Sequence, residues 1–146
     1  MINHDTWLAG YVADLPTPFG DDDAVDLRSL RLLCERQIVA GATALLVCET
    51  AGEASTLTHD EHGGIIAAAV EAAQSTMAVI AGTASNSTSE AVTLAEQAET
   101  AGADAIMAVV PYYNKPTQSG LYAHFSAIAD STRLPIIIHE IGRAHV

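Results

Sequence analysis

Short apolar segments alternate with segments of helical periodicity along the whole chain, and this alternation constrains the fold more than any other feature. The apolar segments are residues 11–15, 44–48, 77–81, 104–110 and 134–139, and we expect each to form a strand. They recur at a period of about 30 residues, the length of a strand–helix–strand unit. Continuous apolar strands joined by helices are typical of a parallel sheet covered by helices. The sequence therefore predicts an α/β fold.

Polar residues indicate where the intervening helices begin and end. Asp26 is expected as the N-cap of the first helix, and Gly41 as its stop. Residues 58–61 (Thr-His-Asp-Glu) and 87–90 (Ser-Thr-Ser-Glu) each have the spacing of a capping box, in which a hydroxyl and a carboxylate bind the N–H groups at a helix start. The fourth helix is indicated by the apolar residues Leu121, Phe125 and Ile128.

A weak internal repeat favours a closed barrel over an open sheet. Residues 40–45 (Ala-Gly-Ala-Thr-Ala-Leu) resemble residues 101–106 (Ala-Gly-Ala-Asp-Ala-Ile), two strand–helix units later. The first strand lacks the Gly-rich turn that marks a dinucleotide-binding sheet. We expect residues 1–140 to form the N-terminal part of a (β/α)8 TIM barrel, with about four βα units and a fifth strand. A complete barrel needs about 250 residues.

Charge and cysteine usage constrain the partners and the compartment. The net charge of −12 argues against nucleic acid and anionic membranes as partners. No apolar run has transmembrane length, and the first residues do not resemble a signal peptide. Cys34 and Cys48 lie in apolar surroundings and are expected as buried thiols rather than a disulfide or a metal pair. We therefore expect a cytoplasmic protein.

Polar side chains follow the expected strands, where the active site of such a barrel lies. The turn Thr50-Ala51-Gly52-Glu53 can offer backbone N–H groups to a carboxylate, and the Thr50 hydroxyl can relay a proton. The same segment is also compatible with an ordinary turn in which Glu53 is solvated or caps a helix. Tyr112 and Tyr113 are either interface aromatics or, for one of them, a proton donor to a carbonyl.

The histidines give no sign of a metal site. His139 ends the fifth strand, where it is either a pocket residue or a buried residue with a partner. His59 and His62 are expected on the surface near a helix start, and His4, His124 and His145 form no constellation. No set of His, Asp and Glu has the spacing of metal ligands. We expect neither a metal nor a cofactor.

Several motifs resemble the dihydrodipicolinate synthase/N-acetylneuraminate lyase family over nearly the whole chain. They are residues 17–19 (Thr-Pro-Phe), 49–57 (Glu-Thr-Ala-Gly-Glu-Ala-Ser-Thr-Leu), 81–83 (Ala-Gly-Thr) and 111–116 (Pro-Tyr-Tyr-Asn-Lys-Pro). The resemblance implies a (β/α)8 barrel in which a lysine on the sixth strand forms a Schiff base with pyruvate or a related 2-keto acid. Lys115, the single lysine of this chain, follows the fourth strand and does not match that position.

The resemblance also implies roles for individual residues. Thr50 matches the relay hydroxyl, and Thr50 with Ala51 matches the turn that binds the substrate carboxylate. Tyr113 matches a tyrosine that crosses a dimer interface into the partner's site, so a homo-oligomer is expected. Two residues depart from the pattern. Ala51 stands where the family usually has Thr or Ser, and His139 stands where it usually has Tyr; imidazole can also shuttle a proton.

The expected activity is that of a Schiff-base lyase or synthase. The first choice joins pyruvate with aspartate semialdehyde in lysine biosynthesis. The alternatives are a sialic-acid or keto-deoxy-sugar aldolase or dehydratase of the same family, or a non-catalytic half-barrel that binds a small carboxylate. The chain alone is expected to be inactive, since no lysine occupies the Schiff-base position.

The last six residues are expected to be a non-native tail. After the fifth strand the family usually continues with a Pro-Gly/Ser-Arg-type turn, whereas residues 141–146 read Ile-Gly-Arg-Ala-His-Val. A common sequencing-library adapter can encode these six residues.

Overall fold

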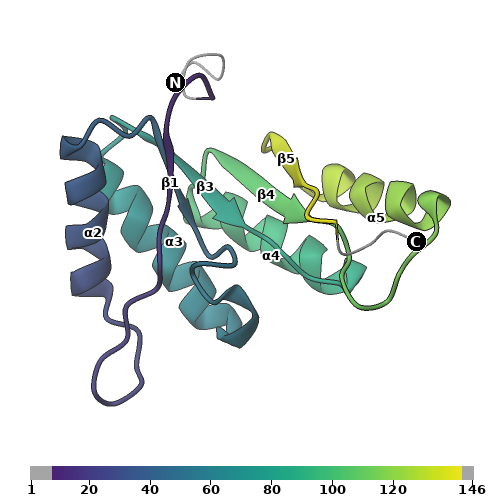
Figure 1. Cartoon of the computed structure of the whole chain (residues 1–146), viewed down its shortest axis with the longest axis horizontal. Helices are drawn as coiled ribbons and strands as arrows, with labels where there is room; N and C mark the ends of the chain where they lie inside the picture. Colours follow the sequence, from purple (N-terminus) through teal and green to yellow (C-terminus); the bar gives the residue numbers. More distant parts are fainter. Residues whose placement is uncertain (1–7, 143–146) are drawn as a thin grey trace.

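The computed structural model describes residues 8–142 and contains a parallel sheet of five strands in strictly sequential order, β1-β2-β3-β4-β5 (Figure 1). The expected tail residues 143–146, with His145, and His4 near the start lie outside the described residues. The strands are β1 (Val12–Asp14), β2 (Ala44–Val47), β3 (Ala78–Gly82), β4 (Ala105–Val109) and β5 (Ile136–His139). The helices are α2 (Leu27–Val39), α3 (His59–Ala73), α4 (Thr88–Ala101) and α5 (Gln118–Ser131), with a short 3-10 helix η1 (Ala54–Thr56) after β2.

The helices pack on one face of the sheet. Alternate strand residues such as Leu45, Val79 and Ile106 belong to a large core cluster that also contains buried residues of the helices, among them Leu30 and Ile65. The residues on the other face form a separate cluster made of strand residues alone: Ala44, Leu46, Ala78, Ile80 and Ala105, with Val12, Met107 and Ile137 partly buried beside them. This mixture of alanines and larger aliphatic side chains suits the filled interior of a barrel.

This arrangement confirms the expected fold class. A doubly wound sheet places helices on both faces and reverses its strand order at a switch point. Here each strand pairs in parallel with the next one along the chain, and β1 and β5 form the two edges within the described residues. A sheet with sequential order and one helix-covered face is the N-terminal part of a (β/α)8 barrel.

Two of the expected helix starts are confirmed. The Asp26 carboxylate accepts hydrogen bonds from the N–H groups of Arg28 and Ser29 at the start of α2. Thr58 and Glu61 form the complete capping box at the start of α3. Gly41, with a φ of 85°, follows the C-cap of α2 and lets the chain turn into β2.

The second expected capping box is wrong. Ser87 is the N-cap of α4, but its side chain makes no capping hydrogen bond. The Glu90 carboxylate instead accepts a hydrogen bond from the Ser85 hydroxyl at 2.6 Å, and Ser85 Oγ accepts one from the Ser87 N–H. The Glu90 carboxylate therefore stabilises the loop that precedes α4 and does not bind the backbone N–H of the N-cap residue.

The junction between β2 and β3 depends on a glycine. A Cβ atom at Gly82 would lie 2.0 Å from the Cys48 carbonyl oxygen and 2.9 Å from the Glu49 nitrogen, so no other residue fits there without movement. Cys48 itself has a φ of 56° and ends β2 one residue earlier than expected. The close approach places the backbone of Cys48 and Glu49 directly beside the end of β3.

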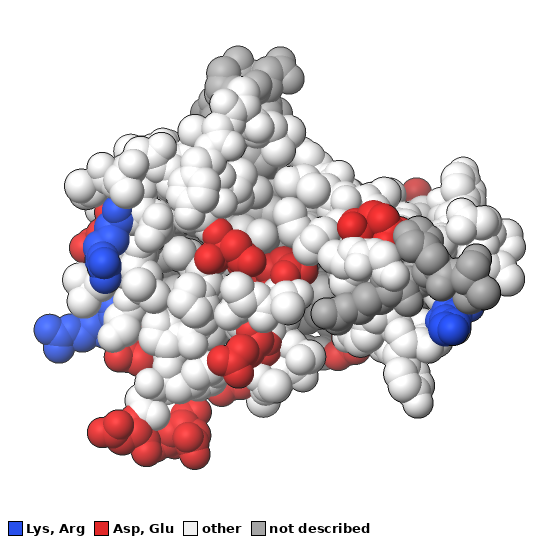
Figure 2. Space-filling model, viewed as in Figure 1, with Lys and Arg blue, Asp and Glu red and all other residues white. Residues whose placement is uncertain are grey.

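The acidic surface and the burial of both cysteines agree with what the sequence predicts. In Figure 2, acidic side chains are spread over the visible face, while Lys and Arg lie near its left and right margins. Cys34 and Cys48 are buried free thiols, as expected, and burial raises their pKa values to about 11 and about 12, respectively. Over residues 8–142, none of the helices is long and apolar enough to cross a membrane.

Candidate active site

Two of the expected site residues, Thr50 and His139, are brought together by Glu49 at the carboxyl ends of β2 and β5. Glu49 is 3% exposed. Its Oε1 lies 3.2 Å from His139 Nδ1, and its Oε2 accepts a hydrogen bond from the Thr50 backbone N–H. One buried carboxylate thus connects a turn after the second strand with a side chain 90 positions later in the sequence.

The surroundings of Glu49 favour its ionised form. Burial acts to raise the pKa of the carboxyl, but hydrogen bonds from the Thr50 N–H, the Thr50 hydroxyl and His139 outweigh it, so the pKa lies below its usual value. An ionised carboxylate can only accept hydrogen bonds. The groups that contact Glu49 therefore act as donors.

A second carboxyl group, Asp14 at the end of β1, interacts electrostatically with Glu49 and His139. Burial raises the pKa of Asp14, the negative charge of Glu49 raises it further, and His139 lowers it. Asp14 thus interacts electrostatically with the Glu49–His139 pair at the carboxyl ends of the strands. Among the described residues, however, no group of three or more His, Cys, Asp or Glu side chains is arranged to hold a metal ion.

The turn that follows Glu49 is fixed by hydrogen bonds of its own. The Thr17 hydroxyl donates to the Gly52 carbonyl oxygen at 2.7 Å, and the Glu49 carbonyl oxygen accepts from the N–H groups of Gly52 and Ala54. Within residues 8–142 the Ala51 N–H has no acceptor, whereas the Thr50 N–H is occupied by Glu49. Of the two backbone donors expected to bind a carboxylate, one is available.

A cavity of about 140 Å³ opens beside this turn. Its lining includes Thr50 and Tyr112, together with Glu53, Ala54, Ser55, Ala84, Val109 and Ile141. Tyr113 does not line it: the residue is 93% exposed and has a φ of 71°. Of the adjacent tyrosines, Tyr112 therefore lines the cavity of its own chain, whereas Tyr113 is exposed and does not.

His62 is not on the surface, contrary to expectation. It is 3% exposed, and its Nε2 lies 2.7 Å from the Gly82 carbonyl oxygen. Burial is the main cause of its lowered pKa, so the ring favours its neutral form. His59 is exposed as expected and lies 3.7 Å from the Glu90 carboxylate. His62 belongs to the α3 face that packs on β3.

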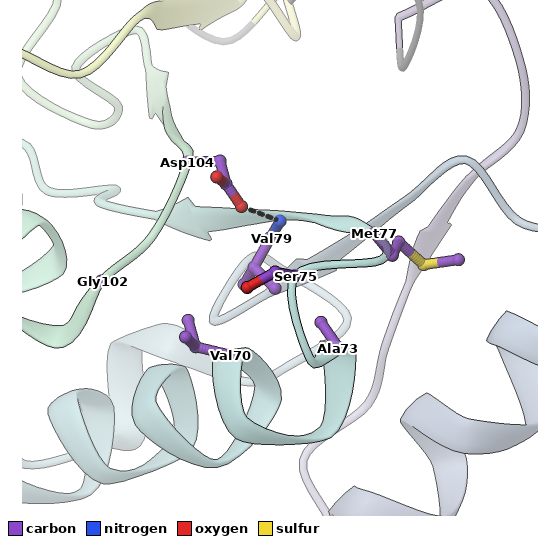
Figure 3. Close-up of a pocket in the computed structure, with 7 residues that line it drawn as sticks. All are labelled: Val70, Ala73, Ser75, Met77, Val79, Gly102 and Asp104. Carbon is purple, nitrogen blue, oxygen red and sulfur yellow. Dashed lines mark hydrogen bonds between the residues drawn. The ribbon is translucent and has the colours of Figure 1, made fainter. Parts of the chain in front are cut away.

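A pocket of about 370 Å³ lies at the opposite end of the sheet (Figure 3). Its lining residues come from the end of α3 and from the segments that enter β3 and β4: Val70, Ala73, Ser75, Met77, Val79, Gly102 and Asp104. The Asp104 carboxylate accepts a hydrogen bond from the Val79 N–H at 2.9 Å, as drawn in Figure 3. The amino ends of barrel strands serve stability rather than chemistry, so this pocket is not the candidate site.

Sequence reasoning missed Glu49 and Asp14 as members of the site. Both positions lie at the ends of expected strands, where polar residues point to a site in a barrel. A carboxylate directly before the Thr50 turn was the available signal, but its partner His139 is remote in the sequence. Their pairing becomes visible only when β2 and β5 are placed in the same sheet.

Comparison with known proteins gives a consistent result. The profile of the "Dihydrodipicolinate synthetase family" matches residues 8–145. The 4-hydroxy-tetrahydrodipicolinate synthase of Chelativorans sp. (strain BNC1) is 52% identical over 132 residues, which cover 90% of this chain and 45% of that protein. The synthase of Gluconobacter oxydans (strain 621H) is 51% identical over 94% of this chain and 46% of its own length.

A solved structure extends the similarity to the fold. The crystal structure of dihydrodipicolinate synthase from Aquifex aeolicus superposes with a TM-score of 0.87 at 48% identity, covering 90% of this chain and 45% of that one. The chain thus spans a little under half the length of the relatives that it matches.

Proposed function

Because the chain belongs to the dihydrodipicolinate synthetase family, we propose that its full-length parent protein joins pyruvate to aspartate semialdehyde, the reaction of a 4-hydroxy-tetrahydrodipicolinate synthase. The observation that carries this proposal is the 52% identity to a protein of that name over 90% of the chain. The parent would act in lysine biosynthesis, in the cytoplasm. Its sixth-strand lysine would form the Schiff base with pyruvate, as the family resemblance implies.

The described residues support particular roles. Thr50 lines the cavity, and its hydroxyl helps to lower the pKa of Glu49, which suits a proton relay. With the Thr50 N–H already occupied, the Ala51 N–H is the backbone donor that would bind the substrate carboxylate. His139 would take the place of the family's usual tyrosine as a proton carrier. Tyr113, exposed after β4, would complete the site of a neighbouring subunit.

Trapping of the Schiff base tests the proposal. The parent protein is incubated with pyruvate and reduced with borohydride, and the adduct is located by mass spectrometry. We expect one stoichiometric pyruvyl adduct on the sixth-strand lysine and, in a separate assay, consumption of aspartate semialdehyde. The 146-residue chain alone should show no adduct, because its single lysine, Lys115, follows β4 rather than lining the barrel. A stoichiometric adduct on Lys115 would contradict the assignment.

A second candidate is an aldolase or dehydratase that acts on a sialic acid or a keto-deoxy sugar. The observation in its favour is that Asp14 and the His139 side chain are accessible near the carboxyl ends of the strands, where they add hydrogen-bonding groups that a polyhydroxylated substrate could use. Both candidates predict the same pyruvyl adduct. They are separated by the second substrate: cleavage of a keto-deoxy sugar without turnover of aspartate semialdehyde would select the aldolase.

A further inference from the structure

Glu49 contacts both residues that the proposed function places at the reacting centre within this chain. Its two carboxylate oxygens are divided between them: Oε2 accepts from Thr50 and Oε1 lies 3.2 Å from His139 Nδ1. The carboxylate is 3% exposed, whereas the His139 side chain is 39% exposed. The carboxylate is thus shielded, while the ring that it holds can be reached from outside.

The hydrogen-bond chemistry of this pair selects one form of the histidine. Because the ionised carboxylate can only accept, His139 Nδ1 must carry the hydrogen that bridges to Glu49. In the neutral ring, the lone pair then lies on Nε2, the nitrogen away from Glu49. A neutral imidazole in this tautomer can accept a proton at Nε2 while its Nδ1–H remains bonded to Glu49.

We propose that Glu49 is a positioning residue that holds His139 in the Nδ1–H form and ties its ring to the Thr50 turn. The proposal rests on the proposed function, because His139 carries a proton only if this site is catalytic. Nε2 of neutral His139 takes a proton from the bound substrate or from water, which gives an imidazolium balanced by the Glu49 carboxylate. The same Nε2 proton is later returned, so the pair ends each cycle unchanged.

A pair that served stability alone would behave differently. Removing the charge of the buried carboxylate would then weaken folding through its lost partners, and turnover of the folded protein would not change. The Nδ1–H tautomer is required by both roles, whereas a positioning role adds a loss concentrated in turnover. Asp14 interacts electrostatically with both Glu49 and His139, so any change with pH must be compared in an Asp14→Asn background.

The first test measures the tautomer directly. In the parent protein labelled with 15N-histidine, the ring nitrogens of His139 are assigned by comparison with the His139→Asn variant. We expect Nδ1 to carry the hydrogen whenever the ring is neutral and Glu49→Gln to weaken this preference. The matched control is Glu90→Gln, which removes another carboxylate next to a histidine, His59, and should leave His139 unchanged. A neutral wild-type ring with its hydrogen on Nε2 would overturn the proposal, and this measurement needs no variant at Glu49.

The second test separates positioning from packing. For Glu49→Gln we expect kcat to fall about 100-fold, with KM within about threefold, an altered pH profile of kcat, and pyruvyl trapping as in the wild type. Glu49→Asp should recover part of the loss. In a His139→Asn background the same Glu49→Gln change should cost little more, because the two residues act as a unit.

The outcomes distinguish this proposal from the proposed function. If the wild-type parent traps no pyruvate, the proposed function is wrong, and so is the positioning role of Glu49 that depends on it. An Nδ1–H tautomer of His139 would in that case indicate only a structural hydrogen bond between Glu49 and His139. If trapping succeeds but Glu49→Gln turns over within about twofold of the wild type, the positioning role alone is wrong. Additive losses in the double variant would also overturn it.

Discussion

At the scale of single residues, Thr50 offers the cleanest separation of chemistry from folding. It is exposed, and its hydroxyl helps to lower the pKa of the neighbouring Glu49. Thr50→Val keeps the shape of the side chain and removes the hydroxyl. We therefore expect the melting temperature of the parent protein to change little, while kcat falls about 100- to 10,000-fold, the range for a lost acid–base group. Steady-state kinetics and thermal melts of the two proteins measure both effects.

The same loop provides the control. The hydroxyl of Thr56 donates to the Glu53 carbonyl oxygen at 2.9 Å and is not part of the proposed machinery. Thr56→Val should therefore leave kcat unchanged. If Thr50→Val retained kcat within about twofold of the wild type, Thr50 would have no place in the mechanism.

The candidate site was only partly predictable from the sequence, for a physical reason. Thr50 and His139 stand at strand ends, so their placement follows from the βα pattern alone. Glu49 and His62 depend on contacts that no local pattern encodes. The buried His62 is satisfied by a carbonyl oxygen of β3, 20 positions away, and Glu49 by a ring 90 positions away.

At the scale of elements, Glu99 connects helix α4 to the segment that enters β5. Its carboxylate accepts hydrogen bonds from the Thr132 hydroxyl and from the backbone and guanidinium N–H groups of Arg133. These contacts, the Thr132 hydroxyl first, lower the pKa of Glu99 to about 2 from its usual 4.5. The ionised form is therefore favoured in the folded state.

The sign of the resulting pH dependence follows from linkage. A carboxyl with a lowered folded pKa stabilises the protein fully above pH 4.5 and loses that contribution as the pH falls toward about 2. We expect Glu99→Gln to lower the free energy of unfolding of the parent protein at pH 7, and the difference from wild type to shrink below pH 4.5. Urea unfolding at several pH values measures this. Glu96→Gln, one turn earlier on the same helix, is the control, and a pH-independent difference for Glu99→Gln would contradict the assignment.

Elements were more predictable than their ends. Apolar periodicity located all five strands and the four α-helices, because burial against a sheet dictates that pattern. The observed strand ends differ from the expected ones by one or two residues. Backbone geometry determines where a strand ends, as at Cys48 with its positive φ. The capping box at Ser87 failed because Ser85, outside the motif, competes for the Glu90 carboxylate.

At the scale of the whole molecule, the two sheet edges predict the behaviour of the 146-residue chain. β1 and β5 each pair on one side within the described residues. Apolar side chains at both edges are exposed, among them Tyr11, directly before β1, at 63% and Ile138 in β5 at 55%. Unpaired strand edges with apolar neighbours favour association. We therefore expect the isolated chain to self-associate and to melt broadly, measured by sedimentation velocity and calorimetry. A monodisperse monomer with a sharp cooperative transition would contradict this.

Assembly of the parent protein gives the last prediction. Tyr113 is 93% exposed and projects from the loop after β4, which suits a side chain that acts in the neighbouring subunit's site. We expect Tyr113→Phe and a variant of the sixth-strand lysine to be inactive separately and to regain part of the activity when mixed. Mixed dimers would then contain one site in which both wild-type groups meet. Native mass spectrometry confirms that subunits exchange. Exchange without recovered activity would confine Tyr113 to its own chain, because every site would then retain one defect.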